Sequence, residues 1–121
     1  MIDHVSLPTQ DLARSVAFYE PLLATLGYQR GLYRPGFFCV FNFEKKPEFW
    51  LSQATQPFGP LHLAFRAKSQ GAVQAFYQVG LDQGAKDNGR PGYRPQYHPD
   101  YYAAFILDLD GYNLEAVVHH R

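Results

Sequence analysis

Apolar residues alternate with polar ones along some stretches of the chain and recur every three or four positions along others. Alternation is typical of strands with one buried face, and the longer spacing is typical of helices. In the first half these patterns predict a strand over residues 2–7, a helix over 12–26 and strands over 28–33, 37–43 and 49–51. In the second half they predict a strand over 61–65, a helix over 70–83 and strands near 86, over 102–109 and over 114–118.

The two halves also share residues at a fixed offset of 58 positions. The pairs are His4 with His62, Leu23 with Leu81, and Ala17-Phe18-Tyr19 with Ala75-Phe76-Tyr77. A helix face and a histidine that recur in step indicate two copies of one βα-type module, about 1–56 and 60–121. A half of this length would bury only about 60% of its unfolded surface, so we expect the modules to pack on each other or on a second chain. The length of the whole chain fits one domain.

Proline and glycine predict where these elements end. Pro8 is expected to end the first strand, and Pro21 to kink the first helix or to divide it into two. A turn is predicted over residues 45–47, a linker between the modules over 53–60, and a long connection over 84–99.

Composition places the chain among ordinary globular proteins and excludes several functions. Eleven basic and eleven acidic residues cancel, so no net charge favours nucleic acid or an anionic membrane as a partner. No segment is apolar over the thickness of a bilayer and no leader pattern opens the chain, so a cytoplasmic location is expected. The lone cysteine, Cys39, rules out an internal disulfide and is expected to be buried. Aromatic residues make up 17% of the chain, which predicts that some of them line a pocket.

Two histidines and one glutamate form the candidate metal site. His4 and His62 are predicted to lie in mid-strand, and Glu115 lies on the last strand with its neighbours facing the other way. Two imidazoles and one carboxylate on rigid strands make a facial triad that leaves positions open for water or substrate. Such a site suits Fe(II), Mn(II), Zn(II), Ni(II) or Co(II), and the ligands do not choose among these divalent ions. His119 would lie about 13 Å along the strand from Glu115 and is interpreted as part of a solvated tail.

Four segments resemble the vicinal oxygen chelate superfamily, which includes glyoxalases, bleomycin-resistance proteins, fosfomycin-resistance proteins and extradiol dioxygenases. They are Ile2-Asp3-His4-Val5, Ala17-Phe18-Tyr19, Leu61-His62-Leu63-Ala64-Phe65 and Asp108-Leu109-Asp110-Gly111-Tyr112-Asn113-Leu114-Glu115, of which the last is the most specific. The resemblance implies an α+β fold in which two βαβββ modules in tandem form a curved mixed sheet around a cleft. It also implies that His4, His62 and Glu115 hold a divalent metal ion. By the same resemblance the protein is expected to form a homodimer, and in such dimers the modules are often exchanged between subunits.

The first module departs from the glyoxalase pattern, in which it supplies a fourth ligand at the position that matches Glu115. The matching residue here is Trp50 or a close neighbour. Glu48 lies two positions away, and a shift of two keeps the face of a strand, so Glu48 is disfavoured rather than excluded. The remaining three-ligand pattern is similar to that of the extradiol dioxygenase and fosfomycin-resistance branches.

Residues 90–102 form the second candidate region, because tyrosine, arginine and histidine gather there among prolines. One interpretation is a loop over the substrate, with Arg94 holding an anionic group. Tyr97 or His98 would then donate or accept a proton. Tyr101 or Tyr102 would form a wall. The other interpretation is a surface loop with a few packed aromatic residues.

These features predict a metal-dependent enzyme that acts on a small oxygen-bearing substrate by Lewis-acid catalysis. The reaction class stays open among lyase, isomerase, thiol transferase and dioxygenase. The alternative is a bleomycin-resistance-like protein that sequesters a small molecule in an aromatic cleft without catalysis. A third interpretation is an interaction or regulatory role on the same fold, which predicts an exposed apolar patch in place of a pocket.

Overall fold

Two units with the same order of elements make up the chain, Met1–Gly59 and Pro60–Arg121. The computed structural model describes residues 1–56 and 59–120, and in this part each unit has one helix and one four-stranded sheet. The predicted fold class, α+β with two βαβββ modules in tandem, is confirmed. Within the described residues, no helix is both long enough and apolar enough to cross a membrane.

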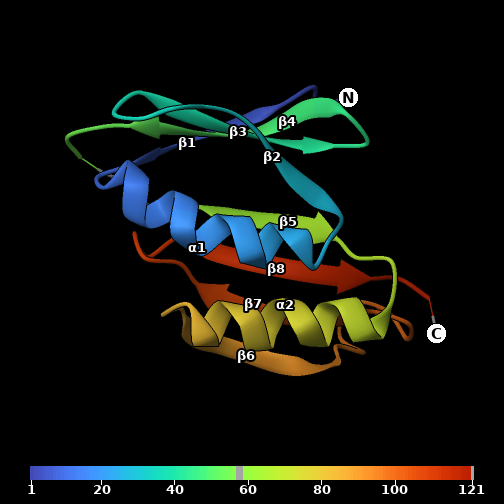
Figure 1. Cartoon of the computed structure of the whole chain (residues 1–121). Helices are drawn as coiled ribbons and strands as arrows, with labels where there is room; N and C mark the ends of the chain where they lie inside the picture. The colour runs from blue at the N-terminus through green and yellow to red at the C-terminus, as the bar shows by residue number, and fades with distance from the viewer. Residues whose placement is uncertain (57–58, 121) are drawn as a thin grey trace. The chain divides into compact units, whose positions relative to one another are not determined.

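The first unit is a mixed sheet with one helix packed against it (Figure 1). Its elements are β1 (Val5–Thr9), α1 (Leu12–Ala24), β2 (Tyr28–Arg34), β3 (Phe38–Phe43) and β4 (Lys46–Gln53). The strand order is β1-β4-β3-β2, with β1 parallel to β4 and the other neighbours antiparallel. Asp11 caps α1, because its side chain accepts a hydrogen bond from the backbone N–H of Arg14.

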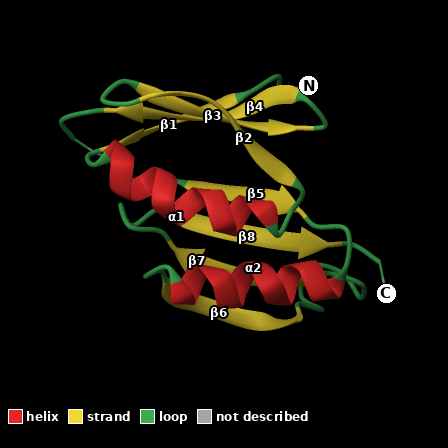
Figure 2. Ribbon diagram, in the orientation of Figure 1, coloured by secondary structure: helices red, strands yellow, loops and turns green. Residues whose placement is uncertain are grey.

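The second unit repeats this topology (Figure 2). Its elements are β5 (His62–Arg66), α2 (Gln70–Asp82), β6 (Lys86–Tyr93), β7 (Tyr102–Leu107) and β8 (Asn113–Val118). The strand order is β5-β8-β7-β6, again with only the first pair parallel. Ser69 caps α2 by accepting a hydrogen bond from the N–H of Ala72.

The core of each unit lies between its helix and one face of its sheet. Phe18 of α1 and Phe76 of α2 hold equivalent places in the two cores and are 1% and 0% exposed. Burying a side chain of this size contributes about 1.5 to 3 kcal/mol. On β8, Leu114 and Ala116 point toward the helix side, so Glu115 between them points to the opposite face. That opposite face carries the candidate site.

The strands that carry the two histidines begin later than predicted. β1 begins at Val5, so His4 precedes the strand, and β5 begins at His62 itself. Neither histidine therefore lies in mid-strand as predicted. Pro8 lies inside β1 rather than ending it. β1 is an edge strand of its sheet, and an edge strand accommodates a residue that has no N–H.

Of the two outcomes predicted at Pro21, a kink or a break, the break is wrong. A single helix runs over Leu12–Ala24 with Pro21 inside it. The next two residues, Leu22 and Leu23, are both 0% exposed. Their burial holds the last helical turn in place, because tertiary packing outweighs local propensity in most protein helices.

The turn predicted over residues 45–47 lies one position earlier. Glu44 and Lys45 have φ angles of 50° and 67°, as a two-residue type I′ hairpin turn requires. Pro47 belongs to β4, where pairing with β3 is irregular between Phe41 and Asn42. A proline is tolerated in a strand at such an irregularity.

The strands predicted over 28–33 and near 86 are present as β2 and β6. Since β6 takes up Lys86–Tyr93, only part of the connection predicted over 84–99 is irregular. The linker predicted over 53–60 includes Pro57 and Phe58, which lie outside the described residues. The division between the units falls after Gly59.

Candidate metal and ligand site

Two of the predicted ligands, His62 and Glu115, lie side by side on the sheet of the second unit. The parallel register of β5 and β8 sets Ala64 opposite Glu115 and His62 opposite Asn113. His62 and Glu115 therefore share a sheet face, and Nε2 of His62 is 2.9 Å from Oε1 of Glu115. The carboxylate is buried, at 2% exposed, whereas the His62 side chain is 48% exposed. The pair thus joins a buried charge to an imidazole that solvent reaches.

The second oxygen of Glu115 is bound by Tyr101, the residue just before β7. The tyrosine hydroxyl donates a hydrogen bond to Oε2 of the carboxylate. Burial raises the pKa of Tyr101, and the hydrogen bond and charge of Glu115 raise it further, so the hydroxyl keeps its proton. Glu115 therefore has a partner on each oxygen, as a buried carboxylate requires. The sequence predicted Tyr101 only as a wall residue, since nothing in its spacing links it to Glu115.

Three further rings surround Tyr101: those of Tyr97, His98 and His119, with centroids at 4.9, 5.4 and 5.2 Å. Nδ1 of His98 accepts a hydrogen bond from the N–H of Asp100, so neutral His98 carries its proton on Nε2. His98 then donates this proton to Nδ1 of His119, 2.9 Å away. His119 follows β8 and is exposed, as predicted for the tail, and its ring is hydrogen-bonded to His98.

Arg94 and Tyr101 stand at the two ends of a loop that closes on itself. The N–H of Arg94 donates to the carbonyl oxygen of Tyr101 at 2.7 Å. The Arg94 guanidinium donates to the carbonyl oxygens of Gly92 at 2.8 Å and Arg90 at 2.7 Å. The roles predicted for Arg94 in anion binding, and for Tyr97 and His98 in proton transfer, stay predictions.

Phe105 of β7 connects this loop to the ligand pair. The guanidinium carbon of Arg94 lies 5.5 Å from the centroid of the Phe105 ring. The same ring stacks against His62, with centroids 6.0 Å apart and an interplanar angle of 25°. Arg94, Phe105 and His62 therefore form a continuous row of ring and cation contacts beside Glu115, which pairs with Phe105 across β7 and β8.

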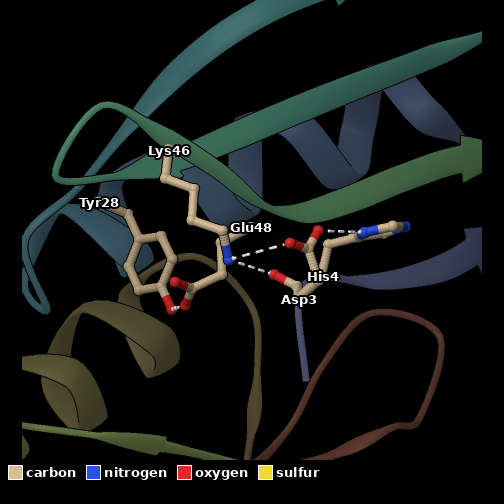
Figure 3. A network of polar contacts seen from close by, with 5 residues as sticks. All are labelled: Asp3, His4, Tyr28, Lys46 and Glu48. Carbon is tan, nitrogen blue, oxygen red and sulfur yellow. Dashed lines mark hydrogen bonds and ion pairs between the residues drawn. The ribbon is translucent and has the colours of Figure 1, made fainter. Parts of the chain in front are cut away.

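His4, the third predicted ligand, belongs to the first unit and lies in a polar network with Asp3 and Lys46 (Figure 3). Oδ1 of Asp3 is 2.9 Å from Nδ1 of His4, and Lys46 donates to the carbonyl oxygen of Asp3 at 2.5 Å. The hydrogen bond to His4 and the charge of Lys46 hold the pKa of Asp3 below its usual value. A carboxylate at Nδ1 keeps the proton of a neutral imidazole there and leaves the lone pair on Nε2. That is the form in which histidine binds a metal.

The register of the first sheet identifies the counterpart of Glu115. Trp50 lies opposite Ser6 in the first unit as Glu115 lies opposite Ala64 in the second. Trp50 is therefore the equivalent residue, as predicted. Glu48, two positions away, accepts a hydrogen bond from the Tyr28 hydroxyl at 2.6 Å (Figure 3), and burial and this bond raise the pKa of Tyr28.

The donor atoms of the second unit suit a divalent metal ion. Within residues 1–56 and 59–120, no group of three or more His, Cys, Asp or Glu side chains is arranged to hold one. Nε2 of His62 donates its proton to Oε1 of Glu115 across 2.9 Å, and an ion bonded to both atoms at about 2.0 to 2.2 Å would take the place of that proton. Because His4 belongs to the other unit, the three-ligand site stays a prediction.

Comparison with solved structures finds the same arrangement of elements elsewhere. A glyoxalase/bleomycin resistance protein from Albidiferax ferrireducens T118 is 28% identical with a TM-score of 0.83, over 100% of this chain and 98% of that one. The chain belongs to the vicinal oxygen chelate superfamily. A candidate glyoxalase from Bacillus halodurans is 27% identical with a TM-score of 0.74, over 97% and 94% of the two chains. A glyoxalase/bleomycin resistance protein/dioxygenase family enzyme from Burkholderia phytofirmans PsJN shares the fold at 21% identity, with a TM-score of 0.71 over 95% of each chain. No protein-family model and no curated protein matches.

In this vicinal oxygen chelate protein the two modules can be compared position by position. Both modules have a histidine at the equivalent position, His4 and His62, whereas the first module has Trp50 where the second has Glu115. Val40 pairs with Trp50 as Phe105 pairs with Glu115, so the first module has an aliphatic side chain at the position where the second has the Phe105 ring. The groups most suited to chemistry are therefore concentrated in the second unit.

Proposed function

We propose that this protein is a divalent-metal-dependent enzyme that acts on a small oxygen-bearing molecule. His62 and Glu115 would be two of the metal ligands and His4 the third. The main support is the 2.9 Å approach of Nε2 of His62 to Oε1 of Glu115, with the other carboxylate oxygen held by Tyr101. A carboxylate fixed at one oxygen presents the other in a defined direction, as oriented metal ligands do.

The chemistry divides between the ion and the chain's own groups. A divalent ion bound at these residues supplies Lewis acidity to an oxygen of the substrate. His98 and His119 are hydrogen-bonded across 2.9 Å, so a proton could pass between the two rings, and His119 is open to solvent for proton exchange. Tyr97, 60% exposed, is a second proton donor beside them. Lyase, isomerase, thiol transferase and dioxygenase reactions all remain open to such a site.

Metal binding by the purified protein tests the proposal. Metal-free wild type, His62→Ala and Glu115→Gln are each titrated with Mn²⁺, Fe²⁺, Co²⁺, Ni²⁺ and Zn²⁺ in a calorimeter. Each variant should lose about 100-fold in affinity, because one ligand has been removed. The matched controls His120→Ala and Glu44→Gln alter an exposed histidine and an exposed glutamate, and should bind like wild type. Equal affinities of His62→Ala and His120→Ala would refute the proposal.

A mixing experiment tests the part assigned to His4. We propose that the protein is a homodimer in which His4 of one subunit joins His62 and Glu115 of the other. His4→Ala and Glu115→Ala dimers then lack a ligand in both sites, whereas a mixed dimer regains one complete site. The two variants are unfolded together, refolded and assayed for bound metal. A mixture that binds no more metal than its parents would show that the site is not shared in this way.

Sequestering of a small molecule without catalysis is a second candidate function. The rings of Phe105, Tyr97 and Tyr101 beside the ligand pair favour it, because aromatic surfaces bind flat molecules without a metal. Ligand binding that persists in a chelator and in His62→Ala would support sequestering. Binding that is lost in both would support the enzyme.

A further inference from the structure

We infer that Arg94 and Phe105 form a binding position for the carboxylate group of a small acid with a flat apolar part. The position lies beside the His62–Glu115 pair. That this acid is the molecule on which the protein acts rests on the proposed function. The binding position itself rests on the contacts of Arg94 and Phe105.

The Arg94 guanidinium is held in place before any ligand binds. Nη1 donates to the carbonyl oxygen of Gly92 at 2.8 Å, and Nη2 donates to that of Arg90 at 2.7 Å. Glycines make room for it, since a Cβ on Gly92 would lie 3.2 Å from Nη1 and one on Gly89 would lie 3.3 Å from Nη2. A ligand that binds to a side chain already ordered loses less entropy, so this arrangement favours binding.

The positive charge of Arg94 has no acidic partner among residues 1–56 and 59–120. The ion pairs in that part of the chain join other residues, for example Arg30 with Glu20 at 3.7 Å. Two carbonyl oxygens engage two of the five guanidinium N–H donors but do not neutralise the charge. A planar guanidinium matches a planar carboxylate and donates charge-assisted hydrogen bonds to it. The unpaired charge therefore favours an acid as the ligand.

Phe105 sets this cation next to the candidate ligands. Its ring contacts the Arg94 guanidinium carbon at 5.5 Å and the His62 ring at 6.0 Å. It is also the direct neighbour of Glu115 across β7 and β8. An acid with its carboxylate at Arg94 would lay its apolar part on Phe105 and direct its remaining groups toward His62 and Glu115.

Binding of benzoate to the metal-free protein tests the inference, with benzamide as the neutral counterpart. An NMR titration follows the Nε–H signal of Arg94 and the ring signals of Phe105. Benzoate should shift these signals and bind about tenfold more tightly than benzamide, because only the carboxylate makes a charge-assisted bond. Arg94→Gln should abolish this preference. Arg66→Gln, which alters an exposed arginine of β5, should leave it unchanged.

Equal binding of benzoate and benzamide by the wild type would overturn the inference. So would a preference that survives in Arg94→Gln, or benzoate shifts that leave Arg94 and Phe105 unaffected. The wild-type comparison needs no variant, so it decides the question even where Arg94→Gln does not fold. The protein is metal-free throughout, so the result is independent of the metal titrations of His62→Ala. Failure of this inference and failure of the proposed function are therefore separate outcomes.

Discussion

The hydroxyl of Tyr101 donates a hydrogen bond to Oε2 of Glu115, a carboxylate that is only 2% exposed. The two residues are 14 positions apart, one in a loop and the other in the middle of β8. With Oε2 held by this bond, the other carboxylate oxygen, Oε1, points toward His62, and its distance from Nε2 of that residue is 2.9 Å. The orientation of Glu115 therefore depends on a loop residue as well as on its own strand.

Tyr101→Phe removes this donor and keeps the ring. We expect the free energy of unfolding to fall by about 1 to 3 kcal/mol, because a buried carboxylate oxygen is left without a partner. Urea unfolding near neutral pH measures the change. Tyr97→Phe is the matched control. Its side chain is 60% exposed, and loss of its hydroxyl should cost no more than about 0.5 kcal/mol. Equal effects of the two substitutions would contradict the role given to Tyr101.

Gly89 of β6 leaves room for the side chains of Phe105 and Arg94, which pack against it. Its φ is +150°, and a Cβ there would lie 2.9 Å from Cδ1 of Phe105. Gly89→Ala should therefore lower the free energy of unfolding by about 1 to 3 kcal/mol. Gly71→Ala is the control, since its Cβ would lie 3.7 Å from the Ser69 hydroxyl, an ordinary contact. Alanine in a helix should stabilise that variant by up to about 1 kcal/mol. Changes of the same sign in both variants would rule out the packing argument.

Cys39 should make stability depend on pH in the alkaline range. Burial raises the pKa of its thiol from 9.0 to about 11. The folded state then holds its proton more tightly than the unfolded state, so this contribution is complete below about pH 9 and is lost toward about pH 11. Urea unfolding across this range should show a steeper decline for wild type than for Cys39→Ala, which has no thiol to titrate. Parallel curves would mean that the thiol has the same pKa in the folded and unfolded states, and would contradict this prediction.

The order of elements could be predicted because both halves carry the same alternation and the same helical spacing. The helices end within two residues of their predicted bounds, at Ala24 and Asp82. Two of the errors fell at prolines, and another at the starts of the strands near His4 and His62. At Pro8 the strand continues because β1 is an edge strand, and at Pro21 the helix continues because Leu22 is buried. Neither the edge position nor the burial is visible in a short window of sequence.

The candidate site could be predicted only where strand alternation determines it. His62 and Glu115 share a face once their strands are neighbours, so their pairing follows from the pattern. Tyr101 reaches Glu115 from a loop, and no periodicity encodes a loop conformation. The same holds for His119, because its distance from Glu115 along the chain carries no information about its contact with His98.

Trp50 holds in β4 the position that Glu115 holds in β8, and its ring centroid is 6.1 Å from that of His4. Trp50→Glu therefore sets a carboxylate beside His4, as Glu115 is set beside His62. We expect this variant to bind Zn²⁺ about tenfold more tightly than Trp50→Gln. The amide has the same size and loses the same ring contacts, but it is a poorer zinc ligand than a carboxylate. Calorimetry on the two metal-free variants measures the difference, after circular dichroism has established that both fold. Identical affinities would show that a carboxylate in this place does not reach an ion at His4, and would count against His4 as a ligand.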